Sequence, residues 1–174
     1  MRISTKTLPL LQKQIMNETT NSLKYTHLAN WCSYNGYNNV AKLMRNQAED
    51  ELGHRDRFIT LLLDSGYMPE AFATEKFDFT INTLEDVVKL GLKTEQKTTA
   101  EIVAIAEAAS DDMDCNVKEF SMWFINEQRE EEALFIDMMD FCTNIGLFDK
   151  DTPEWAKKQM RNELEKRVAE SLED

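Results

Sequence analysis

The chain contains 174 residues, with 32 acidic and 20 basic side chains and a formal net charge of −12. This length is typical of one domain, so we expect a single domain over residues 1–174. The acid excess disfavours nucleic acid and anionic membranes as partners. The three cysteines are widely spaced, which predicts reduced thiols in a cytoplasmic protein. No apolar run reaches the ~20 residues that a membrane-spanning helix requires.

Scarce glycine and proline divide the chain into long segments without interruption, which is typical of helices. Residues 6–34 and 38–65 carry apolar side chains three to four positions apart, and we predict them as the first two helices. Gly66 is a natural residue to end the second helix. Because only Asn35-Gly36-Tyr37 separates these helices, they should be antiparallel neighbours.

A long connection precedes the third helix, which Thr83-Leu84-Glu85-Asp86 opens as a capped N-terminus and which we predict to end near Ala109. The connection has about sixteen residues, and at ~3.3 Å each it reaches roughly 53 Å, the length of a bundle. Such a crossover leaves the second and third helices parallel. After a polar break at residues 110–112, a fourth helix runs to Gly146.

The sequence therefore predicts an all-α four-helix bundle over about residues 6–146, with one long crossover between helices two and three. Asp151-Thr152-Pro153-Glu154 then opens a shorter fifth helix over about residues 152–172. Its apolar side chains form a narrow stripe that needs a surface to pack against. The stripe consists of Trp155, Ala156, Met160, Leu164, Val168 and Leu172.

Each long helix interrupts its apolar stripe near the middle with a possible metal ligand. The candidates are Glu18 in the first helix, Glu51 and His54 in the second, Glu95 in the third and Gln128 with Glu131 in the fourth. In the fourth helix, periodicity does not distinguish Gln128 and Glu131 from Glu127 and Glu130 as the inward pair. One Glu-x-x-His pair is often a solvated helix face, but the coincidence on four helices favours a metal site.

Burial of four carboxylates at one level requires compensation, because each lone charge costs several kcal/mol. Few basic residues share those helix faces, whereas two divalent cations would balance the four charges. Oxygen ligands with one imidazole suit iron or manganese, and Glu-x-x-His on bundle helices is a known arrangement for di-iron sites. The only other histidine, His27, lies nine residues from Glu18, so the second cation should be held less tightly.

Three segments resemble bacterial non-haem ferritin: Trp-Cys-Ser-Tyr at 31–34, Ala-Glu-Asp-Glu-Leu-Gly-His at 48–54 and Glu-Gln-Arg-Glu-Glu-Glu at 127–132. The similarity runs from about Leu10 to Phe148. It implies the ferritin-like architecture and a ferroxidase centre that oxidises Fe2+ with oxygen or hydrogen peroxide. It further implies a hollow cage of 24 subunits in which ferric mineral is deposited.

The resemblance also implies residue roles. Glu18, Glu51 and His54 would hold the first iron, with Glu51 bridging, while Glu95 with Gln128 and Glu131 would serve the second. The catalytic residues would be Tyr25, beside the di-iron centre, with Glu51 and His54. A third, transit iron would lie near Asp50, Glu127 and Glu130. Trp123 also matches a tryptophan of that family, although we expect it to be an ordinary aromatic core residue.

One residue and one segment are informative about which members of that family the chain resembles. Leu52 stands where a haem-binding variant of the family carries methionine, so we expect no haem. The tail after Phe148 is longer and more charged than the short fifth helix of bacterial ferritins, which bears on how a cage would close.

Two alternatives remain open at this point. One is a smaller oligomer that detoxifies iron or peroxide without storing mineral. The other is a non-catalytic acidic helical protein that binds a protein partner, which predicts that Glu18, Glu51 and Glu95 are exposed.

Overall fold

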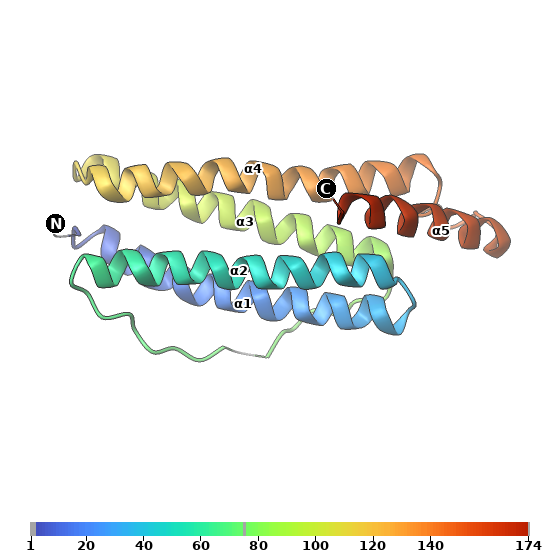
Figure 1. The fold of residues 1–174 in the computed structure, drawn as a ribbon, viewed down its shortest axis with the longest axis horizontal. Coiled ribbons are helices and arrows are strands. Elements are labelled where there is room, and N and C mark those ends of the chain that lie inside the picture. The colour runs from blue at the N-terminus through green and yellow to red at the C-terminus, as the bar shows by residue number, and fades with distance from the viewer. Residues whose placement is uncertain (1–2, 75, 174) are drawn as a thin grey trace.

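A computed structural model describes residues 3–74 and 76–173, and within these residues the regular elements are all helices. The four long helices lie side by side, and the shorter fifth helix lies at one end of them (Figure 1). Their bounds are α1 Thr7–Tyr34, α2 Asn38–Asp64, α3 Leu84–Asp111, α4 Cys115–Asn144 and α5 Glu154–Ser171. The predicted all-α four-helix bundle with a C-terminal fifth helix is confirmed.

The connections set which helices are neighbours. The α1–α2 and α3–α4 pairs form two antiparallel hairpins, and the α2–α3 connection runs along the outside of the bundle from one end to the other (Figure 1). The predicted crossover therefore leaves α2 and α3 parallel. α1 also contacts α3, whereas no described Cα atoms of α2 and α4 approach within 8 Å of each other.

The ends of α3 show one prediction confirmed and one corrected. The expected N-cap is confirmed at its start, where Thr83 and Asp86 form a capping box. At the other end the predicted break at residues 110–112 was placed too early, because α3 continues through Asp111. The chain turns instead at Met113, whose φ of 56° is left-handed, and the Asp114 side chain accepts a hydrogen bond from the Val117 N–H at 3.2 Å to cap α4.

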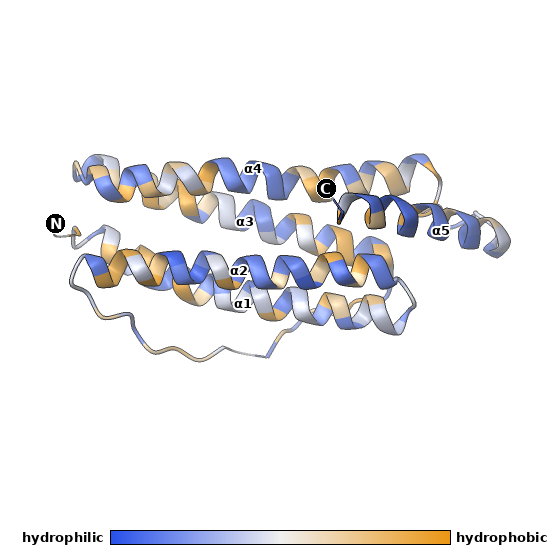
Figure 2. Cartoon of the chain, viewed as in Figure 1, coloured by the Kyte–Doolittle hydropathy of each residue, from blue (hydrophilic) through white to orange (hydrophobic). Residues whose placement is uncertain are grey.

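The core consists of two apolar clusters. The first includes Leu28, Val88 and Phe135 and lies toward the α1–α2 turn and α5. The second includes Leu11 and Phe58 and lies toward the other end. Between them the helices carry polar residues, and Figure 2 shows this hydrophilic stretch near the middle of α2 and α3. None of the described helices is both long and apolar enough to cross a membrane.

α5 packs against α2 and α4 through two buried side chains, Leu164 and Val168. Two charged residues one turn apart add specific contacts. Arg161 donates to the Asn35 carbonyl at 2.7 Å, and the Glu165 carboxylate accepts from the backbone N–H groups of Asn39 and Val40 at the start of α2, at 2.8 and 3.2 Å. Glu165, a residue of α5, therefore caps the N-terminus of α2, a different helix that is distant in sequence.

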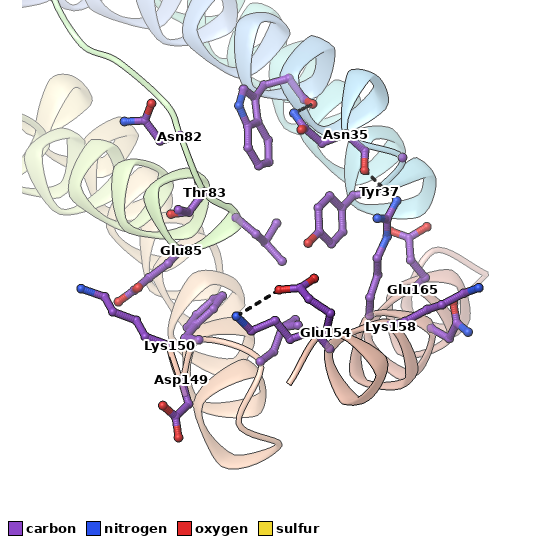
Figure 3. A pocket seen from close by; sticks show the side chains of 18 of the residues that line it. Asn35, Tyr37, Asn82, Thr83, Glu85, Asp149, Lys150, Glu154, Lys158 and Glu165 are labelled. Carbon is purple, nitrogen blue, oxygen red and sulfur yellow. Dashed lines mark hydrogen bonds and ion pairs between the residues drawn. The ribbon is translucent and has the colours of Figure 1, made fainter. Parts of the chain in front are cut away.

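A pocket of about 980 Å³ opens at this end of the bundle, between the α1–α2 turn, the start of α3 and the start of α5 (Figure 3). Its walls carry both charges, including Glu85, Lys158 and Glu165. The predicted apolar stripe of α5 is wrong at Trp155, which is 68% exposed. That residue lies in the first turn of α5, beyond the reach of the bundle core.

Candidate metal centre

The first hairpin brings three predicted ligands together. One possible ligand atom from each of Glu18, Glu51 and His54 lies within 4.8 Å of the others. All three residues are buried, with 0, 2 and 5% of their surface exposed. Glu51 and His54 are three residues apart on α2, a spacing that places both on one face. Glu18 reaches the same point because α1 and α2 are antiparallel.

The second hairpin supplies the other face of the centre. Glu95, Gln128 and Glu131 are buried, and Gln128 Nε2 donates to Glu95 Oε2 at 2.9 Å. Glu131 Oε1 lies 3.8 Å from His54 Nδ1, which joins the two hairpins. The choice that periodicity left open is thereby made, since Gln128 and Glu131 point inward.

The three residues of the expected transit site are arranged differently. Asp50 and Glu130 are exposed and Glu127 is half-buried. Among the described residues, the one group of histidine, cysteine or acidic side chains close enough to hold an ion together is Glu18, Glu51 and His54. The structure thus leaves Asp50 and Glu130 exposed and Glu127 half-buried, and it does not gather the three into a comparable group.

Several buried polar atoms of the centre have no hydrogen-bond partner in the part of the chain that the structure describes. They are Glu18 Oε2, both carboxylate oxygens of Glu51, His54 Nδ1, Gln128 Oε1 and Glu131 Oε2. Buried polar groups are nearly always paired, because each one left unpaired costs about 1–3 kcal/mol. These atoms come from α1, α2 and α4 and consist of oxygens with one imidazole nitrogen, which is a donor set that fits iron.

The electrostatics of the protein alone disfavour ionisation of three of the buried carboxylates, those of Glu18, Glu51 and Glu131. Burial, reinforced by the neighbouring Glu51, raises the pKa of Glu18 well above its usual value. Burial and the charge of Glu95 likewise raise the pKa of Glu131 to about 10, and burial also raises that of Glu51. A cation that binds here must displace protons, so its affinity rises with pH.

Tyr25 lies beside the centre, as the resemblance implied. Its hydroxyl donates to Glu95 Oε1, and its ring stacks on Phe135 with centroids 5.9 Å apart. Phe135 in turn lies against Gly91, where an added Cβ would overlap the Cε1 atom of Phe135. Gly91 is therefore needed for the close approach that seats Phe135 and, through it, Tyr25.

Trp123 differs from the expected core residue. It is 37% exposed, and its ring packs edge-on to His54 with centroids 6.1 Å apart. The Arg57 guanidinium lies 3.9 Å above the Trp123 ring, a favourable cation–π contact. The Trp123 ring therefore spans the distance between the buried His54 and the surface.

Sequence reasoning missed Gln14, which donates to Glu18 Oε1 at 2.9 Å and fixes that carboxylate. The available signal was its spacing of four residues, which places it on the same helix face. The acidic interaction protein considered above predicted exposed acids, and that prediction is wrong because Glu18, Glu51 and Glu95 are 0, 2 and 1% exposed.

Comparison with known proteins identifies the family to which this chain is similar. Residues 8–143 match the family model described as Ferritin-like domain. The chain is 32% identical over 136 residues to a bacterial non-heme ferritin of Escherichia coli O6:H1, which covers 78% of this chain and 82% of that protein. It is 30% identical over 146 residues to a bacterial non-heme ferritin of Staphylococcus aureus, covering 83% and 87% of the two chains.

Solved structures show the same fold. An open pore ferritin from the archaeon Archaeoglobus fulgidus matches with a TM-score of 0.83 and 24% identity, covering 94% of this chain and 96% of that one. At this identity the likeness shows the fold alone, and its coverage of 94% extends beyond the residues that the family model matches.

Proposed function

The chain belongs to the ferritin family, and from that premise we propose that it stores iron after oxidising Fe2+ to Fe3+ at the buried centre. The observation that carries the proposal is the set of unpaired buried oxygens around His54, since a core without a cation would leave them uncompensated. Iron is the substrate of this reaction, and oxygen or hydrogen peroxide is the oxidant.

Each ligand has a proposed role. Glu18, Glu51 and His54 hold the first iron, and Glu51 is shared with the second. Glu95, Gln128 and Glu131 serve the second position, where the neutral amide of Gln128 makes binding weaker. Anionic oxygens stabilise Fe3+ more than Fe2+. Two adjacent irons supply two electrons, which together with two protons reduce oxygen to hydrogen peroxide, or hydrogen peroxide to two waters.

Tyr25 and the surface acids complete the proposed path. The Tyr25 hydroxyl contacts Glu95 and so orients that carboxylate toward the second iron. The exposed residues Asp50 and Glu130, with Glu127, suit a third, transient iron on its way from the centre to the mineral. The mineral would lie within a closed oligomer, and the family suggests 24 subunits for it.

The direct test is anaerobic titration of the metal-free protein with Fe2+, followed by oxygen, with the particle mass measured on the same sample. We expect two or three irons per chain, fast oxidation and a mass near 24 chains. Glu51→Ala and His54→Ala should slow oxidation by more than about 100-fold, since loss of a ligand exceeds the 10–100-fold typical of residues behind it. Without metal these variants should remain folded, because an uncompensated group is removed.

Matched controls exist for both variants. Glu49→Ala removes an exposed acid two residues from Glu51, and His27→Ala removes the only other histidine, which is exposed. Both should oxidise iron at the wild-type rate. Unchanged rates in Glu51→Ala and His54→Ala would reject the proposed centre. The same iron binding on a dimer would instead support a smaller oxidase without mineral storage.

A further inference from the structure

The buried carboxylates of the centre differ in how many of their oxygens the chain itself occupies. Glu95 accepts two hydrogen bonds, from Tyr25 at Oε1 and from Gln128 at Oε2. Both oxygens of Glu51 have no hydrogen-bond partner among the described residues. Glu18 lies between these cases, because its Oε1 is paired whereas its Oε2 has no partner in the same part of the chain. The chain therefore leaves Glu18 one oxygen with which to bind a cation.

The partner of Glu18 Oε1 is Gln14, one turn earlier on α1. Gln14 Nε2 donates to Glu18 Oε1 at 2.9 Å, and the Gln14 side chain is buried, as is that of Glu18. A hydrogen bond between buried groups is costly to break, because no water replaces the lost partner. Gln14 thus holds the Glu18 carboxylate in one orientation.

The amide of Gln14 is itself oriented by a second amide. Asn17 Nδ2 donates to Gln14 Oε1 at 3.4 Å, and Asn17 is buried as well. Because Asn17 takes the oxygen of this amide, Gln14 presents its N–H side to Glu18. The one atom of Gln14 that could bind a cation is thereby occupied, so Gln14 acts on an ion only through Glu18.

We propose that Gln14 is a positioning residue of the centre, which holds Oε1 of Glu18 so that Glu18 binds the first cation through Oε2 alone. A carboxylate that is oriented before the ion arrives loses less conformational freedom on binding, which raises the affinity of the first position. This inference rests on the proposed function, because Glu18 is a ligand of the first position of that same centre.

The test is a titration of the metal-free protein with Co2+, whose visible absorption reports both binding and coordination and needs no oxidation. Gln14→Met removes the donor and nearly keeps the volume of the side chain. We expect the tighter site to weaken about 10–100-fold, the usual effect of losing the partner behind a ligand.

The spectrum provides a second readout, which a loss of packing elsewhere would not change. In Gln14→Met the freed Oε1 of Glu18 can join Oε2 on the ion, and the visible bands of Co2+ weaken as its coordination number rises. We therefore expect weaker bands at one Co2+ per chain. The added oxygen does not restore the affinity, because a carboxylate that binds through both oxygens closes a small, strained ring with the ion.

Two further variants separate positioning from packing. Gln12→Met makes the same chemical change two residues earlier on α1, where the amide bonds to the Met68 carbonyl and the Glu70 N–H of the crossover. It should leave the Co2+ affinity and spectrum at wild-type values. Asn17→Ala removes the residue that orients Gln14, and it should weaken the tighter site roughly two- to ten-fold, the equivalent of one neutral hydrogen bond.

The possible outcomes are distinguishable. If wild type binds Co2+ and a folded Gln14→Met keeps its affinity and spectrum, the role of Gln14 is rejected while the centre stands. Equal changes in Gln12→Met also reject it, because the effect would then be a general one on α1. If circular dichroism shows that Gln14→Met is unfolded, wild-type binding by Asn17→Ala rejects the proposal instead. If wild type binds no Co2+, the proposed function and this inference are both rejected.

Discussion

The middle of the bundle and its two ends follow opposite rules. At the ends, residues such as Leu11, Phe58 and Phe135 are fully buried among apolar neighbours. In the middle, equally buried positions carry carboxylates and amides with unpaired atoms. The ends therefore stabilise the fold by burying apolar surface, whereas burial of unpaired polar groups in the middle lowers the stability of the metal-free chain. The comparison teaches that in this bundle stability and chemistry occupy separate layers.

The largest expected effect on stability lies in an end cluster. Phe135→Ala should lower the free energy of unfolding by about 3–5 kcal/mol, because it leaves a cavity in a closely packed region. It also removes the ring on which Tyr25 stacks. Chemical denaturation of the metal-free protein measures the change. Met122→Ala, at a half-exposed position of the same helix, should change it by less than about 0.5 kcal/mol. Equal effects at both positions would contradict the division into layers.

A second prediction concerns pH and the middle layer. The pKa values of Glu18, Glu51 and Glu131 are raised in the folded chain, that of Glu131 from 4.5 to about 10. The folded state therefore keeps protons that the unfolded state releases, and the metal-free protein should lose stability as pH rises from about 5 to about 9. The loss should exceed about 1 kcal/mol, since each unit of pKa difference corresponds to ~1.4 kcal/mol.

The same titration with Co2+ bound sharpens this prediction. The cation replaces the protons, so stability should then fall less over the same range, or rise. Thermal unfolding of both forms between pH 5 and pH 9 provides the measurement. A metal-free protein that grows more stable toward pH 9 would show that the buried acids are already ionised.

The smallest effect is expected where α5 meets the bundle. Glu165→Gln keeps the shape of the side chain but weakens the cap on the first N–H groups of α2, which should cost about 1 kcal/mol. Glu163→Gln removes an exposed acid of the same helix and serves as the control. Differential scanning calorimetry would detect the difference. An unchanged melting temperature in Glu165→Gln would mean that the remaining contacts of α5, those of Leu164, Val168 and Arg161, are sufficient to hold it.

Much of this molecule was predictable from its sequence, for identifiable reasons. Few glycines and prolines and a regular apolar spacing located the helices, and the length of the connection before Thr83 indicated the crossover. The placement of Glu18, Glu51, His54 and Glu95 on buried faces followed from the same spacing. Their roles as iron ligands stay a prediction that the titrations above test.

Other features depend on how deeply a residue is buried and how far its side chain extends, and the position of a residue around a helix does not predict either. Periodicity gives the face on which Trp123 and Trp155 lie, but the exposed fraction of each depends on where the neighbouring helices end. A long side chain adds a further difficulty, because Lys24 extends over the surface to a partner on its own helix. Gln128 and Glu127 are adjacent in sequence, so periodicity did not distinguish the inward one, whereas the resemblance implied Gln128 and the packed structure buries it.

The crossover divides the centre between two hairpins, and this has a consequence for the order of folding. Glu18, Glu51 and His54 belong to the first hairpin, and Glu95, Gln128 and Glu131 belong to the second. Contacts within a hairpin are close in sequence and form quickly, whereas docking of the hairpins closes a longer loop. We expect the carboxylates to be removed from water only when the two hairpins dock. The metal-free chain should therefore fold most slowly at the pH values at which those acids are ionised in the unfolded chain.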